Sequence, residues 1–331
     1  MRKSPLVVLA LLWVMSASAR ASVTRTVPVR IGYFPNLTHA QALVGRSTGR
    51  FERALAPEAS IRWLQFNAGP SVIEALFAGQ IDLAYIGPGP TLTGFIRSEG
   101  KALRVIAGAA DGGAGLVARK GKGVRSVADL AGHRVASPQA GNTQDIALRH
   151  ALKRAGLAPR EQGGAVWVVP MANHDIRTLF LKGELDAAWV PEPWLSLLIH
   201  DAGGELVLDE RSLWPEGHFV TTHLIASTRF LSEHRDLARR FLREHMELTG
   251  WIEAHPLEAK RELNVALASE TGKRMNEAVL DAAWSRVRFT TDPIRSSLEE
   301  GARRAFELGF LGKKAPDLRN LYDLSLLETI R

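Results

Sequence analysis

A stretch of fourteen residues occurs twice in this chain, and the repeat limits the folds that the chain can adopt. Residues Ile73–Ile86 (IEALFAGQIDLAYI) return, with one residue inserted, as Ile176–Val190 (IRTLFLKGELDAAWV). Each copy predicts a helix that ends at Gly, a tight turn that holds an Asp, and a buried strand. Proline-bearing turns follow at residues 87–90 and 191–193. We expect two similar lobes whose strand ends meet at a shared cleft. Chance or the ordinary pattern of β-α-β units is the alternative.

Strands and helices alternate along most of the chain. This alternation is typical of parallel strands joined by crossover helices, so the predicted fold class is α/β. A length of 331 residues suits two domains. From about Phe230 the sequence predicts mostly helices. The expected strands lie at residues 27–33, 61–66, 81–86, 116–118, 134–136, 166–169 and 187–190.

The N-terminus has the order of a secretory signal peptide. An Arg-Lys pair precedes an apolar run at residues 5–15, and small residues follow it. The run is too short to span a bilayer as a permanent anchor. Cleavage after Ala19 or Ala21 fits, and we take residues 1–21 as the predicted signal peptide. An uncleaved membrane anchor is the alternative.

The formal net charge of +7 is smaller once the predicted signal peptide is removed. Residues 1–21 hold three basic residues and no acidic ones, which leaves 39 basic and 35 acidic residues, a net charge of +4. These charges are interleaved along the predicted helices, which argues against a nucleic-acid partner. Cysteine is absent. Its absence excludes disulfide scaffolds, thiolate metal sites, cysteine catalysis and a lipoprotein anchor.

Three segments place small, hydroxyl and amide residues where a helix is expected to begin: residues 36–39, 67–71 and 141–144. Free N–H groups and the helix dipole make such starts suitable for anions. A hydrogen bond to a charged group contributes about 1.5–3 kcal/mol, so several would hold a small oxyanion without lysine. Ordinary helix capping is the alternative for any one segment. Three such segments on two lobes favour ligand binding.

The sequence offers no convincing catalytic motif. Residues 45–49 (GRSTG) fit G-x-S-x-G, but a helix precedes the Ser where a nucleophile elbow needs a strand. The sequence has no H-E-x-x-H, Walker or G-x-G-x-x-G motif. Asp82 and Asp186 belong to turns, so we expect them to cap those turns. Glu192 follows the second repeat strand, and it either accepts a proton from a ligand or pairs with a neighbouring donor.

A family resemblance covers residues from about Val29 to Phe241. Its motifs are Gly32-Tyr33-Phe34-Pro35, Asn67-Ala68-Gly69-Pro70-Ser71, Gly79-Gln80-Ile81-Asp82, Tyr85-Ile86-Gly87-Pro88, residues 127–136 (VADLAGHRVA), residues 183–188 (GELDAA) and Trp189-Val190-Pro191-Glu192-Pro193-Trp194. In their order and spacing the chain resembles the periplasmic substrate-binding proteins of ABC importers for aliphatic sulfonates, taurine and nitrate.

The resemblance implies a type II periplasmic binding fold, in which two α/β lobes enclose the ligand. Lobe 1 would comprise residues 22–112 and 218–331, and lobe 2 residues 113–217. It further implies a periplasmic monomer without a cofactor or enzymatic activity, whose partners are a small anionic ligand, an ABC permease and its ATPase. Carried over by motif, the ligand contacts are Asn36, Thr38, His39, Gly69, Ser71, Gly87, Pro88, Gly141, Asn142, Thr143, Trp189 and Glu192.

The chain departs from the family pattern in ways that bear on the ligand. Pro88 stands where many sulfonate binders carry an acidic residue, and residues 139–144 replace a serine-rich stretch. Tyr33, Phe34 and Trp189 are expected to line a pocket for a short organic tail, which favours an alkyl sulfonate or a taurine-like compound. Nitrate, a thiamine-pyrimidine precursor and a ligand-sensing role are alternatives. An enzyme on this fold would need Lys or a His/Cys cluster in the cleft segments, which carry neither Lys nor Cys.

Overall fold

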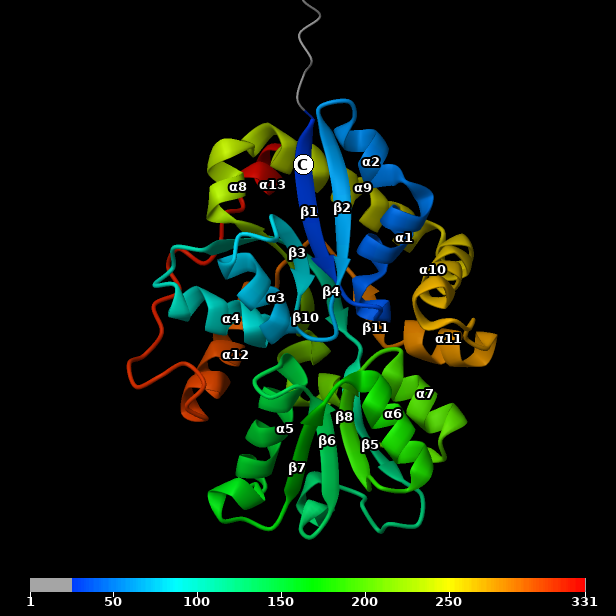
Figure 1. Ribbon diagram of the computed structural model, residues 1–331. Helices are drawn as coiled ribbons and strands as arrows, with labels where there is room; N and C mark the ends of the chain where they lie inside the picture. Colours follow the sequence, from blue (N-terminus) through cyan, green and yellow to red (C-terminus); the bar gives the residue numbers. More distant parts are fainter. Residues whose placement is uncertain (1–25, 331) are drawn as a thin grey trace, which may run out of the picture.

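The computed structural model describes residues 26–330 and places them in two lobes, each built around one β-sheet (Figure 1). The predicted signal peptide lies outside the described residues. Lobe 1 holds a six-stranded sheet in the order β11-β4-β10-β3-β1-β2, and lobe 2 a five-stranded sheet in the order β7-β6-β8-β5-β9. The strands are β1 (Val27–Tyr33), β2 (Ala59–Gln65), β3 (Leu83–Ile86), β4 (Leu103–Gly112), β5 (Ala114–Arg119), β6 (Arg134–Pro138), β7 (Trp167–Met171), β8 (Ala187–Pro191), β9 (Gly204–Asp209), β10 (Val220–Ser227) and β11 (Val287–Phe289).

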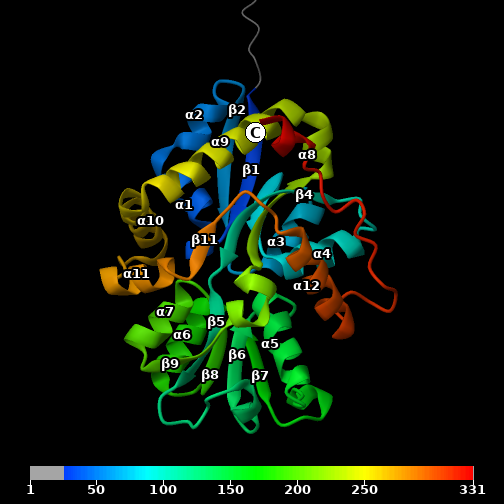
Figure 2. The same ribbon diagram turned by 180° about the vertical axis from the view of Figure 1, so that it is seen from behind.

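Helices cover both faces of each sheet, which confirms the predicted α/β class (Figures 1 and 2). The α-helices are α1 (Ala40–Thr48), α2 (Arg50–Leu55), α3 (Gly69–Phe77), α4 (Pro88–Arg97), α5 (Thr143–Arg154), α6 (Asn173–Lys182), α7 (Trp194–Asp201), α8 (Thr228–Glu233), α9 (Arg235–Ala254), α10 (Pro256–Thr271), α11 (Glu277–Trp284), α12 (Arg295–Glu307) and α13 (Ser325–Ile330). Short 3-10 helices are η1 (Leu37–His39), η2 (Val127–Leu130), η3 (Arg160–Gln162), η4 (Glu210–Leu213) and η5 (Pro215–Gly217).

The sequence repeat forms the same unit in both lobes: α3, a turn and β3 in lobe 1, and α6, a turn and β8 in lobe 2. In lobe 1 the Asp82 N–H donates to the carbonyl of Arg30, and the Asp82 carboxylate accepts the Arg30 N–H, both at 2.9 Å. Asp186 and Arg134 make the same two contacts in lobe 2, again at 2.9 Å. Each Asp therefore fixes its turn to the neighbouring parallel strand, in the turn-capping role predicted for it.

The chain crosses between the lobes twice. It leaves lobe 1 at the end of β4 through Gly112 and Gly113, whose φ angles of 76° and 75° favour glycine. It returns after η5, and β10 then inserts antiparallel between β3 and β4. The sheets draw their strands from within the lobe ranges predicted above. The exact boundaries of those ranges remain a proposal.

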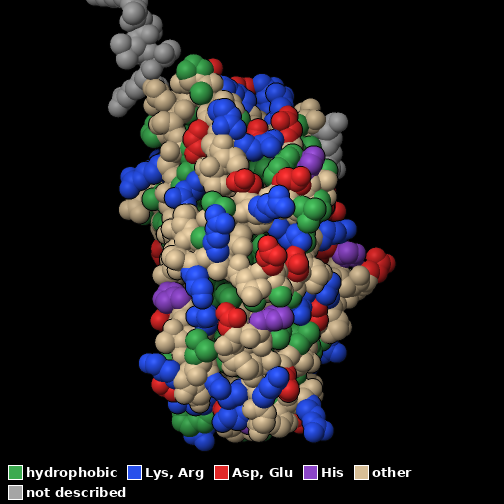
Figure 3. Space-filling model, turned by 90° about the vertical axis from the view of Figure 1, so that its right-hand side faces the viewer, with side chains coloured by type: hydrophobic (Ala, Val, Ile, Leu, Met, Phe, Trp, Pro, Cys, Tyr) green, Lys and Arg blue, Asp and Glu red, His purple; other side chains and the backbone are tan. Residues whose placement is uncertain are grey.

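The surface carries mixed charges. On the face shown in Figure 3, Lys and Arg side chains alternate with Asp and Glu, without a continuous basic area. Within residues 26–330, no helix has the length and apolar character needed to cross a membrane.

Candidate functional site

A small polar cavity lies between the two lobes, where strand ends and helix starts of both lobes meet. Its free space is about 20 Å³, little more than one water molecule needs. A larger ligand therefore enters only if the lobes or their side chains move apart. Within the described part of the chain, no Lys, Arg, Asp or Glu lines the cavity. The lining residues are Phe34, Asn36, Thr38, His39, Asn67, Gly87, Asn142, Thr143, Gln144, Asn173, Pro191, Thr221 and Thr222.

The start of α5 forms part of the lobe 2 side of this cavity. Asn142 is its N-cap, and its side-chain oxygen accepts the N–H of Thr143 at 2.9 Å. The Thr143 hydroxyl accepts the N–H of Gly89, from the first turn of α4 in lobe 1, at 3.2 Å. A Cβ on Gly87 would collide with the same hydroxyl oxygen. Glycine at this position therefore lets the starts of α4 and α5 approach each other.

His39 is a buried, neutral donor on the lobe 1 side. Burial lowers the pKa of His39 to about 3, so the ring carries no charge near neutral pH. The Phe34 N–H points at Nδ1 of His39, 3.4 Å away, and the Phe34 ring packs on the imidazole with centroids 4.6 Å apart. Because Nδ1 is the acceptor, the ring proton sits on Nε2. The ring thus offers an N–H donor without a positive charge.

Two residues that line the cavity each have a buried oxygen without a hydrogen-bond partner within residues 26–330. These oxygens are Oγ1 of Thr222 in β10, which is fully buried, and Oδ1 of Asn173 at the start of α6, which is 7% exposed. An unsatisfied buried polar group costs about 1–3 kcal/mol. The Thr222 hydroxyl could donate to a ligand, whereas the Asn173 oxygen can only accept a hydrogen bond.

Six of the residues predicted to contact a ligand line this cavity, and Pro88 lines an adjoining space between the lobes. These six are Asn36, Thr38, His39, Gly87, Asn142 and Thr143. Their contact with a ligand remains a prediction.

The other five predicted contacts, Gly69, Ser71, Gly141, Trp189 and Glu192, do not line the cavity. A Cβ on Gly69 would collide with Pro90, so this glycine serves the packing of α3 on α4. Gly141 has a φ of 74° and donates its N–H to Asp145. Ser71 is exposed in the first turn of α3.

The expectation that Tyr33, Phe34 and Trp189 line one pocket is corrected. Only Phe34 reaches the cavity. Tyr33 packs edge-on against Trp63 in the lobe 1 core and donates its hydroxyl to Glu270. Trp189 is fully buried in the lobe 2 core, where its indole N–H donates to Glu210 at 2.7 Å.

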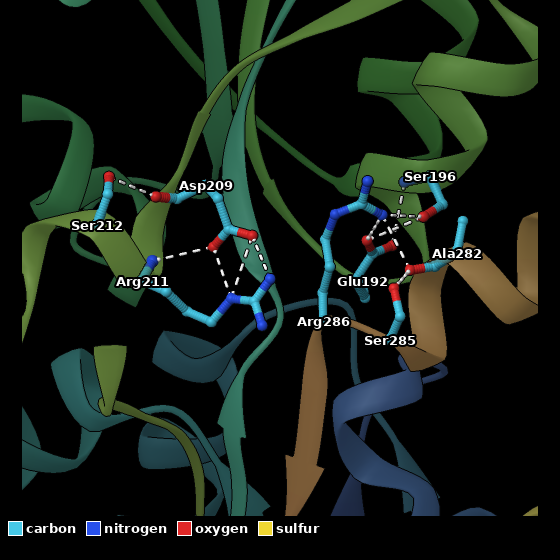
Figure 4. A network of polar contacts seen from close by, with 8 residues as sticks. All are labelled: Glu192, Ser196, Asp209, Arg211, Ser212, Ala282, Ser285 and Arg286. Atoms are coloured by element: carbon cyan, nitrogen blue, oxygen red, sulfur yellow. Dashed lines mark hydrogen bonds and ion pairs between the residues drawn. The ribbon is translucent and has the colours of Figure 1, made fainter. Parts of the chain in front are cut away.

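Glu192 joins the lobes through an ion pair (Figure 4). Its carboxylate accepts the N–H and hydroxyl of Ser196 at 3.0 and 2.9 Å and pairs with Arg286, just before β11 in lobe 1, at 3.1 Å. Burial raises the pKa of Glu192, and the bonds from Ser196 and Arg286 oppose that rise. Its backbone carbonyl also accepts the N–H of Leu37 in lobe 1. Of the two roles considered for Glu192, the structure favours pairing with a neighbouring donor.

Sequence reasoning missed Asn173, Thr221 and Thr222. The repeat itself could have indicated Asn173, because it occupies the position of Pro70 in the other copy, within a segment already chosen as a helix start. Thr221 and Thr222 are neighbours in β10, a strand that the sequence reasoning did not predict. Adjacent threonines in an otherwise apolar run are the signal that could have drawn attention to them.

Comparison with known proteins agrees with this architecture. A model described as "NMT1-like family" matches residues 23–268. The putative aliphatic sulfonates-binding protein of Escherichia coli (strain K12) is 28% identical over 226 residues, and the match spans 64% of this chain and 64% of that relative's length.

Solved structures share the fold. The alkanesulfonate-binding protein from Xanthomonas axonopodis pv. citri bound to MOPS has a TM-score of 0.72 and 22% identity, over 87% of this chain and 96% of that chain. The periplasmic nitrate-binding protein from Synechocystis PCC 6803 has a TM-score of 0.77 and 15% identity, over 92% of this chain and 88% of that chain. These neighbours confirm the predicted type II periplasmic binding fold.

Proposed function

The chain belongs to the NMT1-like family, which agrees with the resemblance drawn from its motifs, and on this premise we propose that it is the solute-binding component of an ABC importer. It captures a small organic monoanion of the aliphatic sulfonate class between its two lobes and delivers the anion to a membrane permease. The proposal includes export by a cleaved signal peptide, a free periplasmic protein, and binding without catalysis.

The observation that carries this proposal is a cavity that offers donors but no charge. Helix starts, the Nε2 proton of His39 and the hydroxyl of Thr222 surround it, whereas Lys and Arg are absent from its described lining. A sulfonate remains a monoanion at physiological pH and presents acceptor oxygens only. Neutral donors satisfy those oxygens, and each hydrogen bond to a charged group contributes about 1.5–3 kcal/mol.

The two segments where the chain crosses between the lobes would act as the hinge for lobe closure. An anion first bound by the donors of one lobe gains those of the other when the lobes close about Gly112 and Gly113. Contacts made only in the closed arrangement shift the population toward it. The permease would then recognise the closed, ligand-bound form of the protein.

Titration calorimetry tests the proposal. The purified protein is titrated with methanesulfonate, propanesulfonate, taurine, sulfate, nitrate and a thiamine-pyrimidine precursor. We expect heat from the alkanesulfonates, and heat from nitrate alone or from the pyrimidine alone contradicts the assignment.

A variant pair locates the site. Thr222→Val removes a buried hydroxyl without changing the shape of the side chain, and we expect about a tenfold loss of affinity, the equivalent of one hydrogen bond of about 1.4 kcal/mol. Thr178→Val changes an exposed threonine of α6 and is the matched control. Equal affinities of the two variants would remove Thr222 from the site.

A further inference from the structure

An apolar slot adjoins the polar cavity on the side of α12. Thr143 lines both spaces, and Ile146, one turn further along α5, lines the slot. The slot therefore continues the cavity along one face of α5. We use the word slot for the space whose main walls are Pro88, Leu92, Ile146, Trp214, Phe219 and Gly301.

Stacked planar groups form one wall of the slot. The rings of Trp214 and Phe219 are stacked with centroids 5.4 Å apart and an interplanar angle of 7°. The guanidinium of Arg304 in α12 lies 3.8 Å from the centre of the Trp214 ring. Leu92 and Ile146 supply aliphatic surface from α4 and α5. Flat aromatic and aliphatic walls favour an apolar group.

The two charged residues at the slot are both engaged. Glu210 accepts the indole N–H groups of Trp189 at 2.7 Å and Trp214 at 3.4 Å. Arg304 donates to Glu300 at 2.8 Å and to the backbone carbonyl of Leu213 at 3.1 Å. An ammonium or a second acidic group on a ligand would therefore meet partners already committed to other groups, and burying it would be unfavourable.

Helix α12 forms one wall of the slot through Ser297, Gly301 and Arg304. It lies in the chain after the second crossing, yet it packs beside α5 of lobe 2 as well as α4 of lobe 1 (Figure 2). Lys153 of α5 reaches the carbonyl of Glu307 at the end of α12. The slot thus has walls from both lobes and widens when they separate.

We propose that the slot holds the organic group of the ligand and selects monosulfonates with an uncharged apolar tail. This inference rests on the proposed function, because it assumes a sulfonate head in the polar cavity. The head would lie among the donors near Thr143, and the tail would run along α5 toward Trp214. The residues of α12 then act as specificity determinants although no charged headgroup touches them.

A chain-length series tests the inference. Affinities for methane-, ethane-, propane- and butanesulfonate are measured with the full protein by calorimetry. We expect about a fourfold gain for each added methylene that enters the slot, the equivalent of about 0.8 kcal/mol of apolar burial. Taurine, which carries an ammonium on the ethyl tail, should bind at least tenfold more weakly than propanesulfonate. Equal or tighter binding of taurine overturns the proposal.

Two substitutions fill the slot from facing walls. Gly301→Leu acts from α12, where a Cβ meets no atom within 4 Å, and Ala147→Val acts from α5. Each should abolish the gain with chain length while leaving methanesulfonate within about twofold. Gly250→Leu, at an exposed glycine of α9 whose Cβ also meets nothing within 4 Å, is the control and should keep the gain.

The outcomes separate the two claims. If the unsubstituted protein binds no sulfonate, the proposed function fails and the slot assignment fails with it. If sulfonates bind and the gain with chain length is absent, or survives both filling substitutions, the slot assignment alone is wrong.

Discussion

Tyr85 in β3 and Trp189 in β8 occupy equivalent positions in the two copies of the repeat, and both are fully buried. The Tyr85 hydroxyl lies 3.0 Å from Nδ1 of His245, whereas the Trp189 indole donates to Glu210. One lobe thus buries a base and the other an acid beside the same structural unit. The repeat specifies the backbone, and the residues brought in from outside the repeat give each lobe its own response to pH.

The largest expected effect is the pH dependence of stability that Glu210 gives to lobe 2. Burial raises the pKa of Glu210 from 4.5 to about 7, against the opposing bonds from Trp189 and Trp214. The folded state holds this proton more tightly than the unfolded state, so stability is full below pH 4.5 and falls as the pH rises. At about 1.4 kcal/mol per pKa unit, the contribution of Glu210 to the free energy of unfolding should drop by about 2–3 kcal/mol between about pH 5 and 7.5. The buried histidines His39, His223 and His245, whose pKa values burial lowers, contribute in the opposite direction.

Glu210→Gln tests this prediction. The variant keeps an acceptor for an indole and removes the titration. The difference in free energy of unfolding between the variant and the unsubstituted protein, measured by urea denaturation, should therefore change by about 2–3 kcal/mol between about pH 5 and 7.5. Identical profiles would mean that Glu210 is not the titrating group.

His245 in lobe 1 should make stability depend on pH in the opposite direction. Burial lowers the pKa of His245 from 6.5 to about 4, opposed by the bond to the carbonyl of Gly108. Since the unfolded state binds the proton more tightly, stability is full above pH 6.5 and falls as the pH decreases toward 4. We expect a loss of about 1.5–2 kcal/mol between about pH 6.5 and 5. His245→Gln should remove this contribution, so the difference in free energy of unfolding between the variant and the unsubstituted protein should change by about 1.5–2 kcal/mol over this range, while His39 and His223 keep their own contributions. A difference that stays constant with pH would contradict the assignment.

The carboxylates of Asp82 and Asp186, in the turns of the two repeat copies, should contribute different amounts to stability. Asp82 is 3% exposed and holds the Arg30 guanidinium through two contacts of 2.8 and 2.7 Å, whereas Asp186 pairs with the more exposed Lys122. We expect Asp82→Asn to cost about 2 kcal/mol and Asp186→Asn about 1 kcal/mol. Denaturant midpoints measure both, with the exposed Asp175→Asn as the control within about 0.5 kcal/mol. A larger cost at Asp186 would reverse the comparison.

The smallest expected effect is a change in ligand affinity, and it comes from the residues that follow β3 and β8, the strands of the two repeat copies. The lobe 1 strand runs through Gly87 into α4 beside the cavity, whereas the lobe 2 strand places Glu192 in the ion pair with Arg286. Glu192→Gln keeps one of the two acceptor oxygens for Ser196 and removes the negative charge that pairs with Arg286 across the lobes. We expect ligand affinity to fall about two- to fivefold by calorimetry, about 0.4–1 kcal/mol. Glu74→Gln in the exposed part of α3 is the control, and an unchanged affinity for Glu192→Gln would show that the pair does not favour closure.

The parts of the fold that depend on neighbouring residues could be predicted from the sequence. The strand at Val27–Tyr33 was predicted with its exact bounds, because its apolar run and the following Pro are local signals. The strand β10 was missed because Thr221, Thr222 and His223 interrupt its apolar run. These polar residues are buried only because β3 and β4 flank the strand on both sides.

The residues of the candidate site also fall into those that local sequence signals indicate and those that only the assembled fold reveals. Asn36 and Asn142 were found because helix starts can be recognised locally. Trp189 was placed wrongly because the face of a strand that points to the core depends on which helices cover it. The role of Glu192 stayed open because Arg286, its partner, lies 94 residues further along the chain. Contacts across that distance follow from the assembled fold alone.

The place of β10 between β3 and β4 has a consequence for the order in which the molecule is made. A ribosome releases β5 to β9 before it releases β10, so lobe 2 has all of its strands while lobe 1 still lacks the partner for two open edges. Domains generally fold as units during synthesis, and unpaired strand edges attract other chains. The lobe synthesised first is therefore completed last, and a chaperone that protects the nascent chain has those two edges to cover until Ser227 emerges.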